Sequence, residues 1–278
     1  MRCAKNLILM ALVALTGVLP FASSSQAMSG QRRLKQSRSF SVLDVDHAWF
    51  LSPSDTSKFQ LEIYYQIHQA GLKFEPDSGR FQAAYELKAT VFDKKNKVVA
   101  RKQIPKTLNV SAERHTRSRQ DFRTSQLDFS LPPGRYWVEV ILTDLNAGKE
   151  FTKSFEAHLK PLKHSRAALS GLEFVHAVQA TRGEGSAFLK GGYDVVPSVV
   201  RTYGGSDSSS LLYYQEIYQG NPSVEQVLLE TRLRHWTKGM VYRDTLYVHF
   251  DNPVKRQLRR ISLEEFPAGS YQIEVYLR

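Results

Sequence analysis

The sequence predicts an all-β fold, and three observations carry that prediction. Apolar and polar residues alternate with a period of two in several segments, most regularly over residues 59–67. Pro-Gly turns precede two of these segments, and short polar turns separate others. No segment of helical length repeats apolar residues every three to four positions. Alternation bounded by turn residues is the pattern of half-buried strands.

Two stretches of the chain share one pattern. Leu131–Leu142 reads LPPGRYWVEVIL, and Phe266–Leu277 reads FPAGSYQIEVYL. The coinciding positions are Pro132/Pro267, Gly134/Gly269, Tyr136/Tyr271, Glu139/Glu274, Val140/Val275 and Leu142/Leu277. A tyrosine just after a turn, at the start of a late strand, is typical of the tyrosine corner of immunoglobulin-like and fibronectin-like β-sandwiches. The repeat therefore predicts two such sandwich domains in tandem, each carrying this strand near its end.

Residues 1–27 have the features of a cleaved signal peptide. Arg2 and Lys5 are basic, Leu7–Ala22 is mostly apolar, and Ser25 and Ala27 place small residues three and one positions before the expected cleavage site. A transmembrane anchor is the alternative, but the apolar run is short and is broken by glycine and proline. We expect cleavage after Ala27 and no transmembrane anchor in the mature chain.

Cleavage would also remove Cys3, the only cysteine of the chain. The mature protein would then contain neither a disulfide nor a reactive thiol, which suits a bacterial envelope better than a disulfide-rich ectodomain.

The remaining chain divides at changes of composition. We expect a basic flexible leader at 28–38, a first β-sandwich at 39–160, a linker at 161–170 and a second β-sandwich at 171–278. In the first domain the expected strands are Phe40–Phe50, Phe59–Ile67, Phe81–Phe92, Val98–Ile104, Gln126–Leu131, the strand after Gly134 and Phe151–Leu159, with a short edge segment at Leu72–Phe74. In the second they are Leu172–Val178, Tyr193–Val200, Leu211–Tyr218, Val224–Trp236, Met240–Phe250 and the strand after Gly269, while Val254–Leu263 is notable only as a basic stretch.

The two expected domains differ at their ends. After the strand that follows Gly134, the first domain continues to Phe151–Leu159, whereas the sequence stops at Arg278 directly after the matching strand of the second. If the domains are true repeats, the second presents an open sheet edge. A truncated reading frame, an imperfect repeat and a partner strand that fills the edge by β-augmentation are the three explanations.

The mature chain is basic. Without the two basic residues of the signal segment, 36 Lys and Arg oppose 27 Asp and Glu, which leaves a net charge of +9. This balance favours anionic glycan, phospholipid or lipopolysaccharide, and export makes nucleic acid an unexpected partner. The candidate contact residues are the basic Arg117, Arg119, Arg123, Lys255 and Arg256 and the outward aromatics Trp137 and Tyr276. A solvated basic surface, and packing of Trp137 between the domains, are the alternatives.

No catalytic signature is present, so we predict no catalytic residue, cofactor or metal site. The best titratable group is Asp44, Asp46 and His47, but on a strand His47 points away from the two carboxylates. Glu113 and His115 predict at most a surface ion pair. The glycine-rich loops Thr181–Gly192 and Tyr203–Ser210 predict hairpin tips, not phosphate or calcium sites.

Several motifs resemble the N-terminal region of the GWxTD-domain proteins, a group of exported bacterial proteins. The likeness spans roughly Asp46–Arg278 and is carried by Phe59–Ile67 with Leu72-Lys73-Phe74, Tyr85 with Asp93, Arg117-Ser118-Arg119, Phe129–Tyr136, Thr143-Asp144-Leu145 with Gly148-Lys149, Leu172-Glu173-Phe174, Arg201–Gly204 and Tyr214–Tyr218. The naming motif itself is absent. The resemblance implies envelope export and β-rich modules, and it supplies no activity.

These observations together predict a non-enzymatic protein-interaction or structural module, located in the periplasm, at the outer membrane or on the cell surface of a Gram-negative bacterium. The alternative is a module that binds anionic glycan or lipopolysaccharide through its basic loops and outward aromatics. Loss of binding at high salt would distinguish the second from the first.

Overall fold

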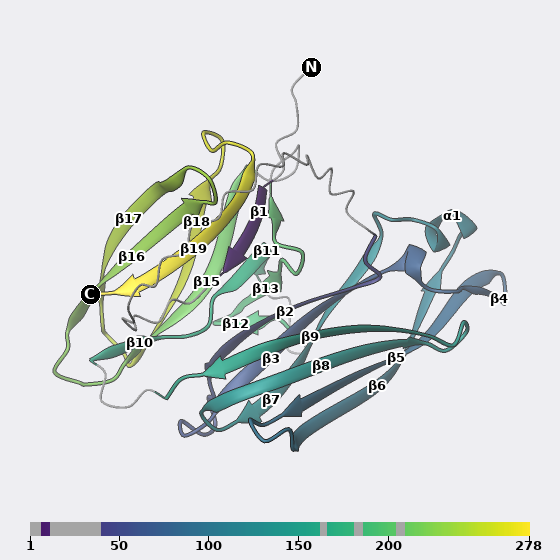
Figure 1. Cartoon of the computed structure of the whole chain (residues 1–278), viewed down its shortest axis with the longest axis horizontal. Coiled ribbons are helices and arrows are strands. Elements are labelled where there is room, and N and C mark those ends of the chain that lie inside the picture. Colours follow the sequence, from purple (N-terminus) through teal and green to yellow (C-terminus); the bar gives the residue numbers. More distant parts are fainter. Residues whose placement is uncertain (1–6, 12–39, 162–165, 181–185, 204–208) are drawn as a thin grey trace, which may run out of the picture.

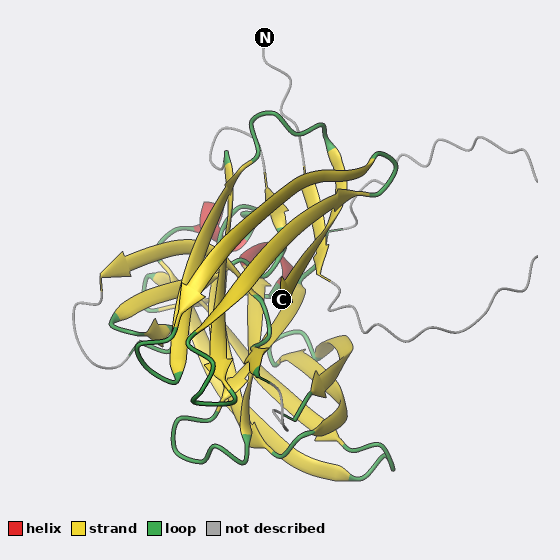
Figure 2. Ribbon diagram, turned by 90° about the vertical axis from the view of Figure 1, so that its left-hand side faces the viewer, coloured by secondary structure: helices red, strands yellow, loops and turns green. Residues whose placement is uncertain are grey.

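The computed structural model describes residues 7–11, 40–161, 166–180, 186–203 and 209–278. These residues form almost entirely antiparallel β-sheet, which confirms the all-β prediction (Figure 2). Helical turns are limited, in the part of the chain described, to η1 (Gln69–Gly71) and α1 (Glu113–Thr116). Residues 40–161 are called the N-terminal half below, and residues 166–278 the C-terminal half.

The N-terminal half contains two sheets. One consists, in spatial order, of β2 (Leu43–Leu51), β3 (Phe59–His68) and β7 (Phe122–Leu131). The other has the order β6 (Val98–Val110), β5 (Arg80–Phe92), β8 (Gly134–Asp144) and β9 (Lys149–Leu159), with β4 (Glu75–Asp77) paired to the start of β5. The expected edge segment at 72–74 thus lies three residues later in the chain.

The two sheets pack face to face around one apolar core. Leu61 and Ile63 of β3, Leu87 of β5 and Val138 and Val140 of β8 are all 0% exposed. Burying one such side chain contributes about 1.5–3 kcal/mol, so the regular alternation of β3 and β8 is what holds the sheets together. The N-terminal half is therefore a β-sandwich.

The C-terminal half repeats this architecture (Figure 1). One sheet contains β10 (Ala167–Leu169), β11 (Glu173–Ala180), β12 (Leu189–Lys190), β13 (Tyr193–Pro197), β15 (Ser210–Gln219) and β18 (Val254–Ser262). The other contains β14 (Thr202–Tyr203), β16 (Gln226–His235), β17 (Gly239–His249), β19 (Gly269–Leu277) and β1 (Leu7–Ala11) from the far N-terminus. Three residues of the expected linker form β10, because Ala167–Leu169 pair with β15.

Strand pairing matches between the halves. The order β2-β3-β7 corresponds to β11-β15-β18, and the order β6-β5-β8 corresponds to β17-β16-β19. All of these pairs are antiparallel. The sequence repeat at Gly134 and Gly269 therefore marks equivalent strands, β8 and β19.

Both faces of β3 are buried, although its alternation predicts one buried face. Glu62, Tyr64 and Gln66, on the polar face, are only 5%, 1% and 7% exposed. This face packs against the C-terminal half. The apolar residues of this junction are Ala48, Phe50 and Tyr64 from one half and Val175, Val195, Val199 and Tyr214 from the other.

No helix in the described ranges is both long enough and apolar enough to cross a membrane.

Candidate functional site

The turn before β8 and the turn before β19 have the same local structure. The Tyr136 hydroxyl donates a hydrogen bond of 2.9 Å to the carbonyl oxygen of Pro132, and the Tyr271 hydroxyl bonds the carbonyl of Pro267 in the same way. Both tyrosine rings are buried. The tyrosine corner predicted from the sequence is confirmed in both copies, because each hydroxyl donates a hydrogen bond to the backbone carbonyl four residues upstream.

The two equivalent strands have different neighbours on one side. β8 lies between β5 and β9, and β9 pairs with all of β8 from Gly134 to Asp144. β19 lies between β16 and β1. In the place that β9 occupies in the first sandwich, the second has a five-residue strand from the opposite end of the chain.

The β1–β19 pairing is parallel, and no other strand pair of the described residues is. It joins Leu7 to Gly269 and Ala11 to Ile273 in register. On its other side, β1 pairs antiparallel with β14, Leu7 opposite Tyr203. The edge of β19 and β14 thus flank a slot one strand wide, which we call the β19 slot.

An apolar core lies under the β19 slot. Tyr203 of β14 and Tyr271 and Ile273 of β19 belong to one buried cluster with Leu233 of β16, and each is at most 4% exposed. A strand in the slot therefore closes a hydrophobic core as well as satisfying the backbone groups of β19.

The predicted basic contacts do not form one surface. Arg117, Arg119 and Arg123 are exposed and lie between α1 and the start of β7, whereas Lys255 and Arg256 lie on β18 in the other half (Figure 1). Arg119 sits over the Phe40 ring, 5.3 Å from its centroid.

Three of these five cations have acidic partners. Arg117 pairs with Glu113 at 2.7 Å, and Lys255 pairs with Asp251 at 2.5 Å. Arg256 lies 3.4 Å from Glu216. Exposed pairs of this kind contribute little stability, but they reduce the positive charge available to an anionic ligand.

The predicted outward aromatics have different surroundings. Tyr136 and Val138 face the core as expected, and Trp137 is 44% exposed on the opposite face of β8. On the N-terminal side, β2 and β3 form the junction between the halves, whereas β8 belongs to the other sheet. Trp137 therefore does not pack between the two halves. Tyr276 is half-buried, and the Arg232 guanidinium lies 5.0 Å from its ring centroid.

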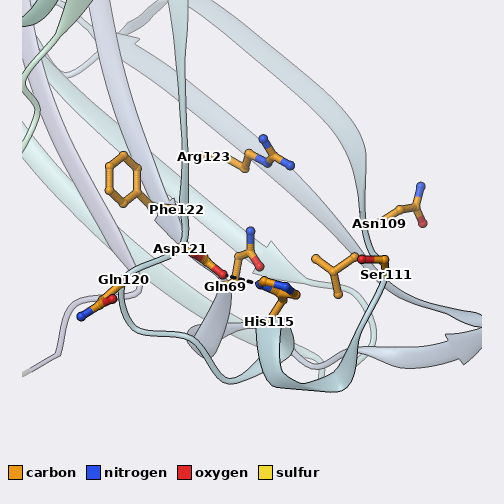
Figure 3. A pocket seen from close by; sticks show the side chains of 9 residues that line it. Gln69, Asn109, Ser111, His115, Gln120, Asp121, Phe122 and Arg123 are labelled. Carbon is orange, nitrogen blue, oxygen red and sulfur yellow. Dashed lines mark hydrogen bonds and ion pairs between the residues drawn. The ribbon is translucent and has the colours of Figure 1, made fainter.

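Arg123 also lines an open polar cavity of about 490 Å³ near α1 (Figure 3). There His115 Nδ1 lies 2.9 Å from Asp121 Oδ2, and this hydrogen bond lowers the pKa of the Asp121 carboxyl. Ser111 lines the same cavity, but within the described chain its hydroxyl makes no hydrogen bond with His115. Glu113 pairs with Arg117 and His115 pairs with Asp121, so these two residues take part in surface ion pairs with other partners and form no site together.

Asp44, Asp46 and His47 of β2 do not converge on one point. This agrees with the prediction that side chains alternate along the strand, so that His47 points away from the two carboxylates. Arg201 forms a two-pronged ion pair with Asp46, and Asp44 lies 3.4 Å from His68 Nε2. The His47 ring stacks on Phe155 at 4.2 Å, and burial lowers its pKa to about 4. All three residues are engaged in packing and pairing.

Groups of three or more metal-binding side chains do not occur in the residues that the structure describes. Of the glycine-rich loops, Gly191 and Gly192 have positive φ and link β12 to β13, which is the expected hairpin tip. Residues 181–185 and 204–208 lie outside the described residues.

The fold and the slot define a β-sandwich protein with an edge that holds an added strand. No protein-family model matches this sequence, and neither does any curated protein.

Proposed function

We propose that this protein is an exported, non-enzymatic interaction module of the bacterial envelope, with two tandem immunoglobulin-like domains and the β19 slot as its binding site. The observation that carries the proposal is the parallel pairing of Leu7–Ala11 with Gly269–Ile273. It occurs beside β19 at the position that β9 occupies beside β8.

Export would empty the slot. Leu7–Ala11 lies inside the predicted signal peptide, so cleavage after Ala27 removes β1. The edge of β19 then loses the backbone partners it has in the full chain, and unpaired edges favour the addition of another strand. A partner strand would restore those hydrogen bonds and cover Tyr271 and Ile273.

The geometry of the slot indicates the partner's chemistry. Residues of the guest in register with Gly269, Tyr271 and Ile273 face the core, because side chains alternate along a strand. The two residues between them face outward. The proposed ligand is therefore an extended protein segment of at least five residues whose alternate side chains are apolar, bound parallel to β19.

The envelope location rests on other grounds. The predicted signal peptide and the resemblance to the exported GWxTD-domain proteins support the periplasm or the outer membrane. Binding of anionic glycan is less favoured, because the basic candidates lie in two halves and three of five are ion-paired.

A peptide-binding experiment tests the proposal. Residues 28–278 are mixed with a synthetic peptide of residues 5–13, and amide hydrogen exchange is followed at low and at high salt. We expect slower exchange at 269–273 at both salt concentrations, since apolar burial and backbone pairing are little screened. A peptide with Leu9→Pro, which lacks a donor and breaks the strand, is the control.

Unchanged exchange at 269–273 with the unmodified peptide, or equal slowing by the Leu9→Pro peptide, would refute strand addition. Retention of anionic glycan at low salt only, without any effect of the peptide, would favour the glycan-binding alternative.

A further inference from the structure

A lysine of the C-terminal half is inserted into the junction between the halves. Lys190 is the last residue of β12, and its side chain is 9% exposed. Its contacts include Glu62, Tyr64 and Phe50, all from the N-terminal half. Lysine is rarely buried unless its charge is matched, so the surroundings of this amine require an explanation.

Two buried carboxylates contact the amine. Lys190 Nζ lies 2.6 Å from Glu62 Oε2 and 2.5 Å from Glu173 Oε2, and these two acidic side chains are 6% and 0% exposed. The Tyr64 hydroxyl lies 3.3 Å from Nζ and donates a 2.6 Å hydrogen bond to Glu62 Oε2. Glu62 belongs to β3 and Glu173 to β11, so one ammonium joins the two halves.

Three aromatic rings surround the same ammonium. Nζ lies 3.8 Å from the ring centroid of Phe50, 5.2 Å from that of Tyr214 and 5.7 Å from that of Tyr64. The faces of aromatic rings attract cations, most strongly where water is excluded. Rings and carboxylates together form an enclosure for a positive charge.

The charges of the enclosure depend on the ammonium. Burial raises the pKa of Glu62, and it raises the pKa of Glu173 to about 7. Although burial alone would lower the pKa of Lys190, Glu173 and Glu62 raise it. Without the amine, two buried acids would face each other without a counter-charge, which is strongly destabilising.

We propose that this enclosure is a binding site for a primary ammonium group, which Lys190 fills and thereby fixes the two halves to each other. Its walls are Phe50, Glu62 and Tyr64 from the N-terminal half and Glu173 and Tyr214 from the C-terminal half. A cavity of about 310 Å³, lined in part by Phe50, Glu62 and Lys190, adjoins it. When the lysine side chain is shortened, the site takes a small alkylammonium ion in its place.

The test is chemical rescue of Lys190→Ala. We expect this variant to melt on the order of 10 °C below the wild type, since it leaves buried carboxylates unpaired. Ethylammonium should then raise its melting temperature progressively with concentration, as a ligand of the folded state does. Sodium chloride at equal ionic strength and the bulkier tetramethylammonium should not.

Lys238→Ala is the matched control, because Lys238 is exposed in a turn of the C-terminal half. It should melt like the wild type and show no response to ethylammonium. A Lys190→Ala protein that melts like the wild type, or that responds equally to sodium and ethylammonium, overturns the proposal.

Two further measurements apply if Lys190→Ala does not fold. The triple variant Glu62→Gln, Glu173→Gln, Lys190→Met removes the charges together and should fold. In the wild type, ring currents of Phe50 should shift the Lys190 ε-methylene proton resonances upfield. Failure of the triple variant to fold, together with resonances at their solvent-exposed position, would contradict the site.

Discussion

β8 and β19 begin alike and end differently. Each follows a Pro-x-Gly turn, carries a tyrosine corner and pairs antiparallel with one strand of its own half, β5 or β16. On the other side, β9 covers all of β8, whereas β1 pairs only with Gly269–Ile273. The Pro-x-Gly turn and its tyrosine thus determine how each strand begins. The strands paired beside it determine how deeply the remaining residues of that strand are buried.

Burial along the two strands reflects this difference. Val140 and Leu142 of β8 are 0% exposed. Their counterparts Val275 and Leu277 of β19 are half-buried. The inward-facing side chains at the end of β19 are therefore more accessible than those at the end of β8.

The largest expected effect compares the two leucines. Leu142→Ala should lower the free energy of unfolding by about 2–5 kcal/mol, because it opens a cavity in a closed core. Leu277→Ala should cost less than half as much, since its side chain is already in partial contact with water. Urea unfolding of both variants measures the difference, and equal losses would mean that the two strand ends are equally covered.

A second comparison concerns the two turn glycines. A Cβ at Gly269 would overlap the His235 ring, which is held in place because the backbone N–H groups of Thr237 and Lys238 donate to its Nδ1. At Gly134 the nearest atom is the Tyr136 hydroxyl at 3.1 Å. Gly269→Ala should cost about 1–3 kcal/mol by overpacking, and Gly134→Ala distinctly less. The reverse order in thermal unfolding would contradict this account.

The third prediction is a pH dependence of opposite sign in the two halves. The folded-state pKa of Glu173, about 7, lies above its ordinary value of 4.5, so the stability it contributes is present below pH 4.5 and lost as pH rises through 7. The pKa of His47, about 4, lies below its ordinary 6.5, so its contribution is present above pH 6.5 and lost as pH falls toward 4.

Two variants separate these contributions. Relative to Glu173→Gln, the wild type should lose stability between pH 5 and pH 8; relative to His47→Phe, which keeps the stacking on Phe155, it should gain stability over the same interval. Each difference should be on the order of 1–3 kcal/mol, since one unit of pKa corresponds to about 1.4 kcal/mol. Unfolding curves at the two pH values decide the signs, and a common sign would rule out the assignment.

The smallest expected effect is the same in both halves. Tyr136→Phe and Tyr271→Phe each remove one hydrogen bond to a proline carbonyl, and each should cost about 1 kcal/mol. Calorimetry of the two variants and of the double variant would show additive losses. A loss confined to one half would mean that the two corners are not equivalent.

Most of the longer strands were predictable from the sequence, because alternation and turn residues are local features. The alternation of residues 59–67 and the turns at Gly134 and Gly269 predict β3, β8 and β19 within a few residues. Each tyrosine corner follows from five residues of sequence, Pro132–Tyr136 and Pro267–Tyr271. The apolar run that contains Leu7–Ala11 fits a signal peptide, and nothing local indicates its pairing with β19.

The junction between the halves was not predictable in this way. Glu62 and Tyr64 alternate with apolar residues as a solvent-facing pair would, and Lys190 lies more than a hundred residues away in the sequence. The one available signal was the combination of an acidic and an aromatic residue on the outer face of a strand whose inner face is wholly apolar. Only the fold shows that Glu173 and Lys190 meet them there.

The burial of both faces of β3 has a consequence for the folding of the chain during synthesis. Residues 40–161 emerge before residues 173–214 during synthesis, so for that interval the outer face of β2 and β3 is uncovered and able to associate with other chains. A charge within such a face acts as a gatekeeper against aggregation. Glu62 is therefore suited to two periods in the life of the chain: it repels neighbouring nascent chains while it is exposed, and it binds Lys190 once the second half has folded onto it.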